Sequence, residues 1–189
     1  MSIKNKEKKI FDTSHKNKFR FDKCFPKMAY KDQERGVILQ NVKKSKGIVY
    51  GSTSVGVQTP YPFYRKQFTD VDILVPRPKK VALQTEQSLD DWADMNCYYV
   101  EELHYPTGTT WRIINRCRNN EVVADVSPMK HKPKNVTING VRYETLASRE
   151  QAIRKMIKDP EAIYRREKDI KNLGWVIRIK KARRAINWR

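Results

Sequence analysis

An α+β fold is the architecture that the sequence predicts, with a mixed central sheet of about five strands flanked by helices, plus helices at the C-terminus. Short runs rich in Val, Ile, Tyr and Thr alternate along the chain with amphipathic stretches of helical period. In addition, 39% of the 189 residues are hydrophobic, which is enough to bury one core.

The N-terminal part is predicted to be a basic arm followed by a helix. Residues 1–20 are polar, rich in Lys and without period, as expected of an arm. A helix is expected around Tyr30–Lys43 and ends near Gly47. We therefore assign residues 1–45 to an N-terminal arm and helix.

The central part, residues 46–140, is predicted to hold the strands. "GIVYGS" is a short apolar strand that stops at Gly51, and "DVDILVP" is a second one. An amphipathic helix follows over residues 79–96. "CYYVEELHY", "TTWRIINRC" and "EVVADVSP" are separated by turn residues and predict an antiparallel meander. Asn139-Gly140 is a good hairpin turn.

The C-terminal part, residues 141–189, is predicted to be basic and helical. Ser148 is the expected N-cap of a helix that ends near Pro160. A second helix is expected to close at Gly174, before a basic tail that carries Trp residues.

The distribution of charge divides the chain in the same way. The net charge is +19, with +9 in residues 1–46, −2 in residues 47–129 and +12 in residues 130–189. A chain this basic usually binds a polyanion, most often nucleic acid. A slightly acidic centre between basic flanks suits an enzyme that gathers metal ions on carboxylates and holds a polyanionic substrate. A folded core between solvated flanks would give the same distribution.

Asp70 and Asp72 are the candidate metal ligands of the centre. They are two residues apart on a predicted strand, so both carboxylates point to the same face. Two adjacent negative charges repel, and a divalent cation between them makes the arrangement tolerable. Asp125 ends a Val-rich strand and offers a third carboxylate. Three carboxylates with two metal ions suit in-line displacement at phosphorus.

Gly51-Ser52 is the candidate phosphate-binding element. Glycine lets the backbone approach a phosphate closely, and Ser52 adds a hydroxyl and an N–H. The pair is weak evidence by itself, but it directly follows a strand and precedes the strand that bears the two acids.

Together these residues resemble the polymerase β-like nucleotidyltransferase superfamily, whose pattern is a strand, Gly-Ser, a helix, a strand with Asp-x-Asp and a later third acid. The match covers roughly residues 46–130, with "VYGS" at 49–52, "DVDILV" at 70–75 and "VVADVSP" at 122–128. A looser match to the helices of minimal nucleotidyltransferases and viral poly(A)-polymerase-like proteins continues over residues 141–173.

The resemblance implies a nucleotidyltransferase fold and roles for particular residues. Asp70, Asp72 and Asp125 would hold two Mg²⁺ (or Mn²⁺) ions, and Asp125 would help to lower the pKa of the attacking hydroxyl. The nucleoside triphosphate would be bound by Gly51 and Ser52. On the helices that follow, the candidates are Lys155 and "RREKD", residues 165–169.

The segment between the two halves of the motif is longer than is usual in the family, so the helix after Ser52 must be short or interrupted. Its residues "TPYPFYRKQF" form an inserted loop, in which Arg65 and Lys66 are candidates for contacting the nucleotide. A packed surface loop is an equally good interpretation.

The basic tail is the candidate nucleic-acid interface, because cations can follow phosphates while aromatic rings stack on bases. Its candidate residues are Arg178, Lys180, Lys181, Arg183, Arg184 and Trp188. A solvated basic surface is the alternative for this tail.

We predict a Mg²⁺-dependent enzyme that adds nucleotides from an NTP or dNTP to the 3′ hydroxyl of a nucleic acid, most simply single-stranded RNA or DNA. The alternatives are transfer to a protein or small molecule, an inactive nucleic-acid-binding subunit of the same fold, and a structural basic protein of a virus or phage. The sequence does not indicate an oligomeric state.

The chain is expected to be cytoplasmic. No apolar run approaches the 18 residues of a membrane span, and no secretory signal is visible. Cys24, Cys97 and Cys117 have no metal-ligand spacing and are expected to be buried or free thiols in a reducing compartment.

Overall fold

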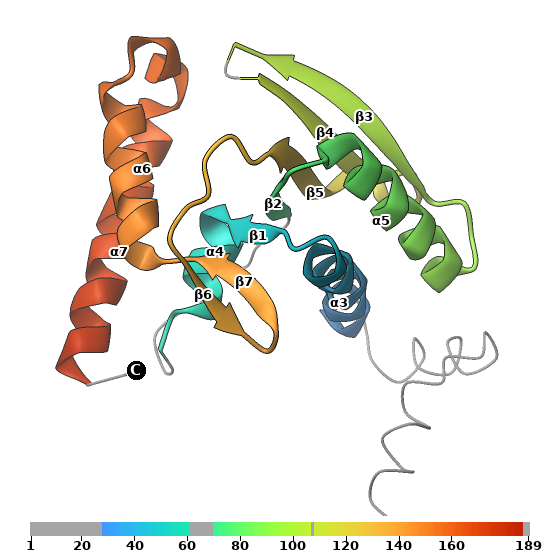
Figure 1. The fold of residues 1–189 in the computed structure, drawn as a ribbon, viewed down its shortest axis with the longest axis horizontal. Helices are drawn as coiled ribbons and strands as arrows, with labels where there is room; N and C mark the ends of the chain where they lie inside the picture. The colour runs from blue at the N-terminus through green and yellow to red at the C-terminus, as the bar shows by residue number, and fades with distance from the viewer. Residues whose placement is uncertain (1–27, 61–69, 107, 187–189) are drawn as a thin grey trace, which may run out of the picture.

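One mixed sheet organises the part of the chain that the computed structural model describes, residues 28–60, 70–106 and 108–186 (Figure 1). Its strand order is β3-β4-β5-β2-β1-β7-β6. The strands are β1 (Ile48–Tyr50), β2 (Val71–Val75), β3 (Tyr98–Tyr105), β4 (Gly108–Asn115), β5 (Glu121–Pro128), β6 (Asn135–Ile138) and β7 (Val141–Glu144). The predicted α+β class is confirmed. The sheet has seven strands rather than about five, because β7 pairs with β1 and brings the β6–β7 hairpin into it.

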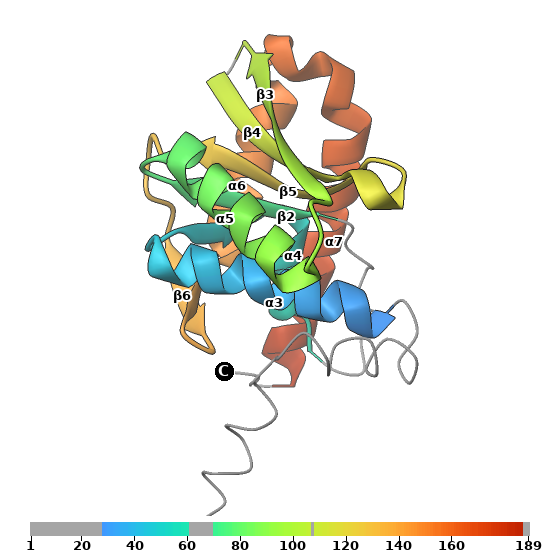
Figure 2. The same cartoon turned by 90° about the vertical axis from the view of Figure 1, so that its right-hand side faces the viewer.

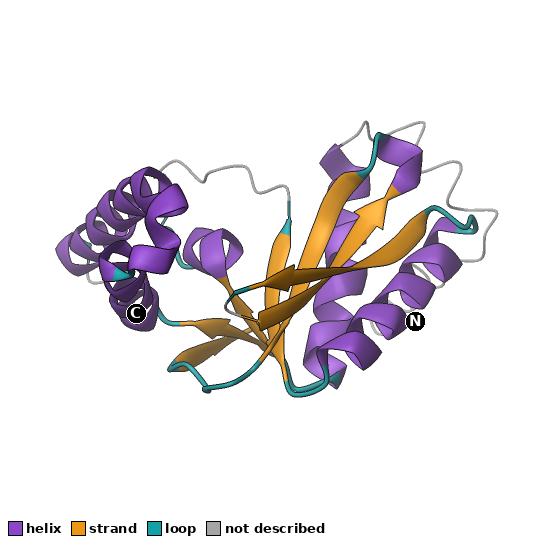
Figure 3. Cartoon of the chain, turned by 90° about the horizontal axis from the view of Figure 1, so that it is seen from above, coloured by secondary structure: helices purple, strands orange, loops and turns teal. Residues whose placement is uncertain are grey.

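Helices cover both faces of this sheet (Figure 3). They are α3 (Met28–Lys44), α4 (Gly51–Val57), α5 (Pro78–Ala93), α6 (Leu146–Lys158) and α7 (Arg166–Ala185), with the short 3₁₀ helices η1 (Arg116–Arg118) and η2 (Pro160–Arg165). On one face α3 and α5 lie side by side (Figure 2), and on the other lie α4, α6 and α7. None of the described helices is long and apolar enough to cross a membrane.

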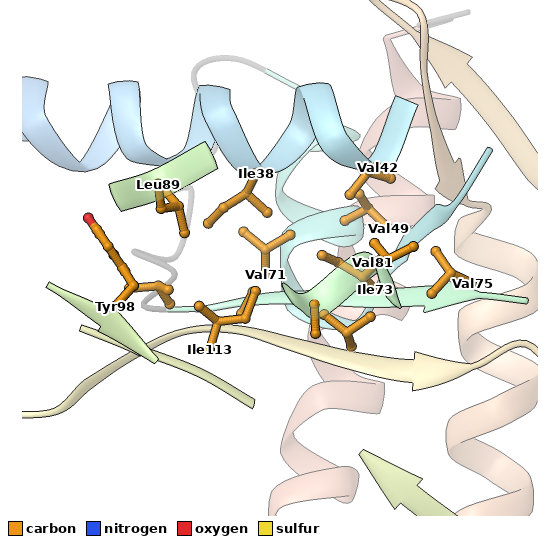
Figure 4. Close-up of a cluster of buried hydrophobic side chains, with 14 of the residues drawn as sticks. Ile38, Val42, Val49, Val71, Ile73, Val75, Val81, Leu89, Tyr98 and Ile113 are labelled. Carbon is orange, nitrogen blue, oxygen red and sulfur yellow. The ribbon is translucent and has the colours of Figure 1, made fainter. Parts of the chain in front are cut away.

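The main hydrophobic core lies between the sheet and the α3–α5 layer (Figure 4). Side chains alternate between the faces of a strand, so β2 buries Val71, Ile73 and Val75 here and directs Asp72 to the opposite face. A second, smaller core joins α4, α6 and α7. The sheet face that bears Asp72 is therefore the face shared with these three helices.

The strands that carry the predicted acids are neighbours. β3, β4 and β5 form the predicted antiparallel meander, and β5 then runs parallel to β2. The register pairs Asp72 with Asp125 and, on the other side of β2, Asp72 with Tyr50. The sheet thus places the third acid directly beside the Asp-x-Asp pair.

Two boundaries in the C-terminal part differ from the prediction. Thr145, and not Ser148, is the N-cap of α6, because its side chain accepts a hydrogen bond from the Ser148 backbone N–H. Gly174 does not close a helix but lies inside α7. An interior glycine costs a helix about 1 kcal/mol, which the burial of Val176 and Ile179 against the α6 side offsets.

The predicted free thiols are wrong for two of the three cysteines. Cys97 precedes β3 and Cys117 follows β4, and a disulfide joins them across a Cα–Cα distance of 5.3 Å. The antiparallel pairing of β3 with β4 brings them together, which their separation of 20 residues does not reveal. The bond argues against a reducing compartment. Cys24 lies outside the described residues.

Candidate active site

Three carboxylates converge on the sheet face that α4, α6 and α7 share. Asp70, Asp72 and Asp125 each offer one oxygen, and these oxygens lie within 4.8 Å of one another. All three side chains are partly exposed. Asp72 and Asp125 are paired on adjacent parallel strands, and Asp70 comes just before β2. The sequence predicted this convergence, and the registers supply the geometric reason for it.

The carboxylates repel one another. The pKa of Asp72 is raised from 3.8 to about 7, first by burial and then by the charges of Asp70 and Asp125. Arg149 and Lys168 act in the opposite direction and lower that pKa. Near neutral pH Asp72 is therefore poised between its protonated and ionised forms, and a bound cation would favour the ionised form.

Oxygen-only ligands in this arrangement suit a hard divalent cation such as Mg²⁺ or Mn²⁺. The raised pKa of Asp72 is a second sign of fit, because a bound cation would offset both causes of the shift, the burial of the carboxylate and the charges of Asp70 and Asp125. The set is consistent with metal binding, as the sequence predicted.

Gly51 is the residue on which the approach of α4 to the acids depends. Its φ is +69°, which favours glycine, and a Cβ at this position would collide with the carboxylate of Asp72. The helix that it begins has seven residues, so the predicted short helix after Gly51-Ser52 is confirmed. Thr53, on the same helix, donates a hydrogen bond of 3.0 Å to the backbone carbonyl of Asp70.

Glu144, at the end of β7, holds α4 against the sheet through hydrogen bonds. Its backbone carbonyl accepts hydrogen bonds from Ser54 Oγ at 2.6 Å and Gln58 Nε2 at 2.8 Å. Burial raises the pKa of its side chain, and a hydrogen bond from the Gly51 backbone N–H partly offsets this. The Gly51 N–H is therefore already used by Glu144, and the lack of a side chain at Gly51 makes space for the carboxylate of Asp72. Ser52 is the residue of the pair whose side chain can bind a phosphate.

Asp125 has a guanidinium directly beside it. Arg112, its register neighbour on β4, donates from Nε to Oδ1 at 2.9 Å and from Nη2 to Oδ2 at 3.1 Å. The sequence analysis did not single out Arg112. The signal was present in the predicted meander, but it required the pairing register of two strands.

A hydroxyl chain runs beside the carboxylates. The Tyr50 hydroxyl hydrogen bonds to Ser127, whose Oγ is 2.9 Å from Thr110 Oγ1. Burial and the charge of Asp72 raise the pKa of Tyr50, so this hydroxyl stays protonated. Tyr50 therefore places an uncharged hydroxyl beside the acids, which sequence reasoning missed.

Besides Arg112 of β4, cations of α6 and α7 act on the site. Arg149, in the second turn of α6, affects the pKa values of Tyr50, Asp72 and Glu144, and Lys168 affects that of Asp72. Lys168 lies in the "RREKD" run that the resemblance indicated, whereas Arg149 was missed. Lys155 is exposed on α6. Arg65, Lys66 and Trp188 lie outside the described residues.

The predicted nucleic-acid residues that can be placed all lie on α7. Arg178, Lys181 and Arg184 are exposed. Lys180 is paired with Glu150 of α6 at 2.5 Å, so part of its charge serves the packing of the two helices. Arg183 is partly buried.

A solved structure shares this arrangement of strands and helices. The Megavirus polyadenylate synthase superposes with a TM-score of 0.65 at 17% sequence identity, over 82% of this chain. The chain has a nucleotidyltransferase fold. This confirms the fold that the motif resemblance implied.

The match covers only part of the Megavirus protein, because this chain spans 32% of its length. Weaker similarities are found to JHP933 from Helicobacter pylori, with 12% identity, a TM-score of 0.47 and coverage of 80% of this chain and 66% of that one. An antigenic nucleotidyltransferase-like protein from Paracoccidioides brasiliensis has 15% sequence identity and a TM-score of 0.41, and the match covers 76% of this chain and 74% of that one. By sequence, neither a family model nor a curated protein matches.

Proposed function

We propose that this protein is a Mg²⁺-dependent nucleotidyltransferase that adds nucleotides from an NTP or dNTP to the 3′ hydroxyl of a nucleic acid. One observation carries the proposal: Asp70, Asp72 and Asp125 converge within 4.8 Å on a nucleotidyltransferase fold. In this proposal residues 46–140 supply the carboxylates and residues 141–189 supply cations for the substrates.

The sheet order suggests where the two substrates lie. Gly51 and Ser52 follow β1 on one side of Asp72, and Asp125 lies on β5 on its other side. We assign the triphosphate to the β1 side, where Ser52 can donate to it and where Arg149 and Lys168 add positive charge. The acceptor hydroxyl is then assigned to the side of Asp125.

The reaction forms a bond from the acceptor 3′ oxygen to the α-phosphorus and breaks the bond from that phosphorus to the oxygen of the leaving pyrophosphate. The hydroxyl proton is released to water. Asp70, Asp72 and Asp125 would hold the metal ions, which supply charge neutralisation at the phosphoryl oxygens and a lower pKa of the hydroxyl. The chain's own contribution is to place the two oxygens in line at phosphorus.

The charge of the chain favours a polymer as the acceptor over a small molecule. Residues 130–189 carry a net charge of +12, and Arg178, Lys181 and Arg184 are exposed on α7. A single strand is the proposed form, because exposed cations can follow a phosphate backbone without reading a duplex groove. Lys155, Arg65 and Lys66 remain predicted nucleotide contacts.

The proposal is tested by incubating the full chain with Mg²⁺ or Mn²⁺, each α-labelled NTP and dNTP in turn, and single-stranded RNA and DNA oligonucleotides with free or blocked 3′ ends. The expected result is extension of the oligonucleotides with a free 3′ hydroxyl only, with release of pyrophosphate. Absence of product with every nucleotide and acceptor would overturn the polymer-extending function.

A further inference from the structure

Arg112 belongs to a row of paired residues that crosses five strands on the active face. The registers place Tyr50, Asp72, Asp125, Arg112 and Glu101 side by side, on β1, β2, β5, β4 and β3. Directly paired residues share a face of the sheet, so the guanidinium of Arg112 stands next to the candidate metal ligands. It is partly buried, with 28% of its side chain exposed.

Both oxygens of Asp125 accept from this one side chain, at 2.9 and 3.1 Å. A guanidinium bound in this two-pronged way fixes the plane of a carboxylate as well as its position. Glu101 and Tyr105, on β3, also act electrostatically on Arg112 and support it from the far side. The direction in which Asp125 faces is therefore set by β4 and β3, and not by β5 alone.

The ion pair leaves room for a cation on the same carboxylate. Each carboxylate oxygen has two acceptor positions, and Arg112 uses one on each oxygen. One Asp125 oxygen also lies within 4.8 Å of oxygens of Asp70 and Asp72. A divalent cation at the triad would then share Asp125 with Arg112, with a fixed unit of positive charge beside it.

We propose that Arg112 is a positioning residue with two effects on the triad: it holds Asp125 in the plane that faces Asp70 and Asp72, and its charge weakens the binding of the divalent cation. The inference rests on the metal-binding role of the triad in the proposed function. The two effects of Arg112 can be measured separately, because a Lys at this position keeps the charge of Arg and loses the two-pronged contact with Asp125.

The test is a titration of the full chain with Mn²⁺ at pH 8.0 in the absence of nucleotide, with free Mn²⁺ followed by electron paramagnetic resonance. Arg112→Gln is expected to bind Mn²⁺ about tenfold more tightly than wild type, because a cation next to a dication is removed. Arg112→Lys is expected to bind Mn²⁺ within about threefold of wild type, because the charge is retained.

Turnover supplies the second measurement. Both variants lose the fixed plane of Asp125, so kcat is expected to fall about tenfold or more in each, while KM for the nucleotide changes little. Arg154→Gln is the control, since Arg154 donates from Nε and Nη2 to one oxygen of Glu150 on α6, away from the triad. It is expected to leave both Mn²⁺ affinity and kcat unchanged.

The outcomes separate this inference from the proposed function. If Asp72→Asn binds Mn²⁺ as wild type does, the triad is not the metal site and the proposed function itself fails. If Asp72→Asn loses Mn²⁺ but Arg112→Gln binds it no more tightly, the account of Arg112 is overturned and the metal site stands. The account of Arg112 is also overturned if Arg112→Lys binds Mn²⁺ as tightly as Arg112→Gln, or keeps a wild-type kcat.

Discussion

Two sites in this protein hold acidic side chains in different surroundings. We call the first the Glu34 cluster, formed by Glu34, Tyr98, Asn115 and Arg118. Glu34 is 5% exposed and accepts hydrogen bonds from Tyr98 Oη at 2.6 Å, Arg118 Nη2 at 2.6 and 2.8 Å, and Asn115 Nδ2 at 3.3 Å. A guanidinium, a hydroxyl and an amide of the protein thus bind this acid.

The Asp70–Asp72–Asp125 triad gathers three like charges, and its Asp72 has a pKa raised to about 7. The Glu34 cluster joins α3 to β3, β4 and η1 on the core side of the sheet, while the triad lies on the other face. The comparison indicates that a satisfied buried acid serves the fold. A group of acids in which burial and mutual repulsion raise a pKa is a candidate ligand site, and this one is consistent with a divalent cation.

The largest expected effect is on catalysis. Asp72→Asn and Asp70→Asn each remove a metal ligand and are expected to lower nucleotide transfer by about a thousandfold or more. Initial rates at saturating Mg²⁺ measure the effect. The matched control is Glu34→Gln, which alters an acid of the other group and is expected to retain transfer wherever the variant is folded. An equal loss of nucleotide transfer in Glu34→Gln and in the triad variants would contradict the distinction between the two sites.

The next effect is on stability, which we expect to depend on the Glu34 cluster more than on the triad. Glu34→Ala leaves Arg118 without its buried partner and is expected to lower the free energy of unfolding by about 3 kcal/mol. Urea denaturation monitored by Trp fluorescence gives the change. A variant as stable as wild type would show that the Glu34 cluster does not hold α3 on the sheet.

A smaller effect follows from the pKa of Asp72. Because its pKa is about 7 in the folded protein and 3.8 ordinarily, the metal-free fold gains stability from the bound proton below about pH 4 and loses that gain as pH rises through 7. The loss is expected to be about 2 kcal/mol, since partial exposure screens the charge.

Melting curves from pH 4 to 8 provide the measurement. Asp72→Asn should lack this part of the pH dependence and melt at a higher temperature than metal-free wild type at pH 8. Mg²⁺ should raise the melting temperature of wild type at pH 8 and leave that of Asp72→Asn almost unchanged. If Mg²⁺ stabilises both proteins equally, the triad is not where it binds.

The smallest effect concerns the acceptor. Replacing Arg178, Lys181 and Arg184 by Gln is expected to reduce the salt dependence of oligonucleotide binding, lowering the slope of log affinity against log salt by about 2. Lys79→Gln with Lys80→Gln on α5 is the control, because these exposed lysines lie in the other helical layer. An unchanged slope in the triple variant would remove α7 from the interface.

The parts of the molecule predicted correctly are those that depend on local pattern. Alternation placed Asp70 and Asp72 on one face, and the apolar runs predicted the strands that bring Asp125 beside them. What sequence reasoning missed depends on partners far along the chain. Arg112 acquires its role only through the β4–β5 register, and Arg149 only because α6 packs beside α4.

Two wrong predictions, the helix end at Gly174 and the free thiols, have the same origin. Gly174 has the chemistry of a helix end, but tertiary burial of Val176 and Ile179 carries α7 past it. Cys97 and Cys117 are joined by a hairpin whose register no spacing rule contains. Local propensity predicted the elements, and contacts between elements decided where they end and which side chains meet.

The central claim is that Asp70, Asp72 and Asp125 together bind a divalent cation, and anomalous diffraction from crystals grown with Mn²⁺ tests it most directly. The account predicts an anomalous peak at coordinating distance, about 2.1 Å, from one oxygen of each of the three carboxylates. A protein crystallised with Mn²⁺ whose anomalous peaks all lie elsewhere, with the three aspartates uncoordinated, would contradict it.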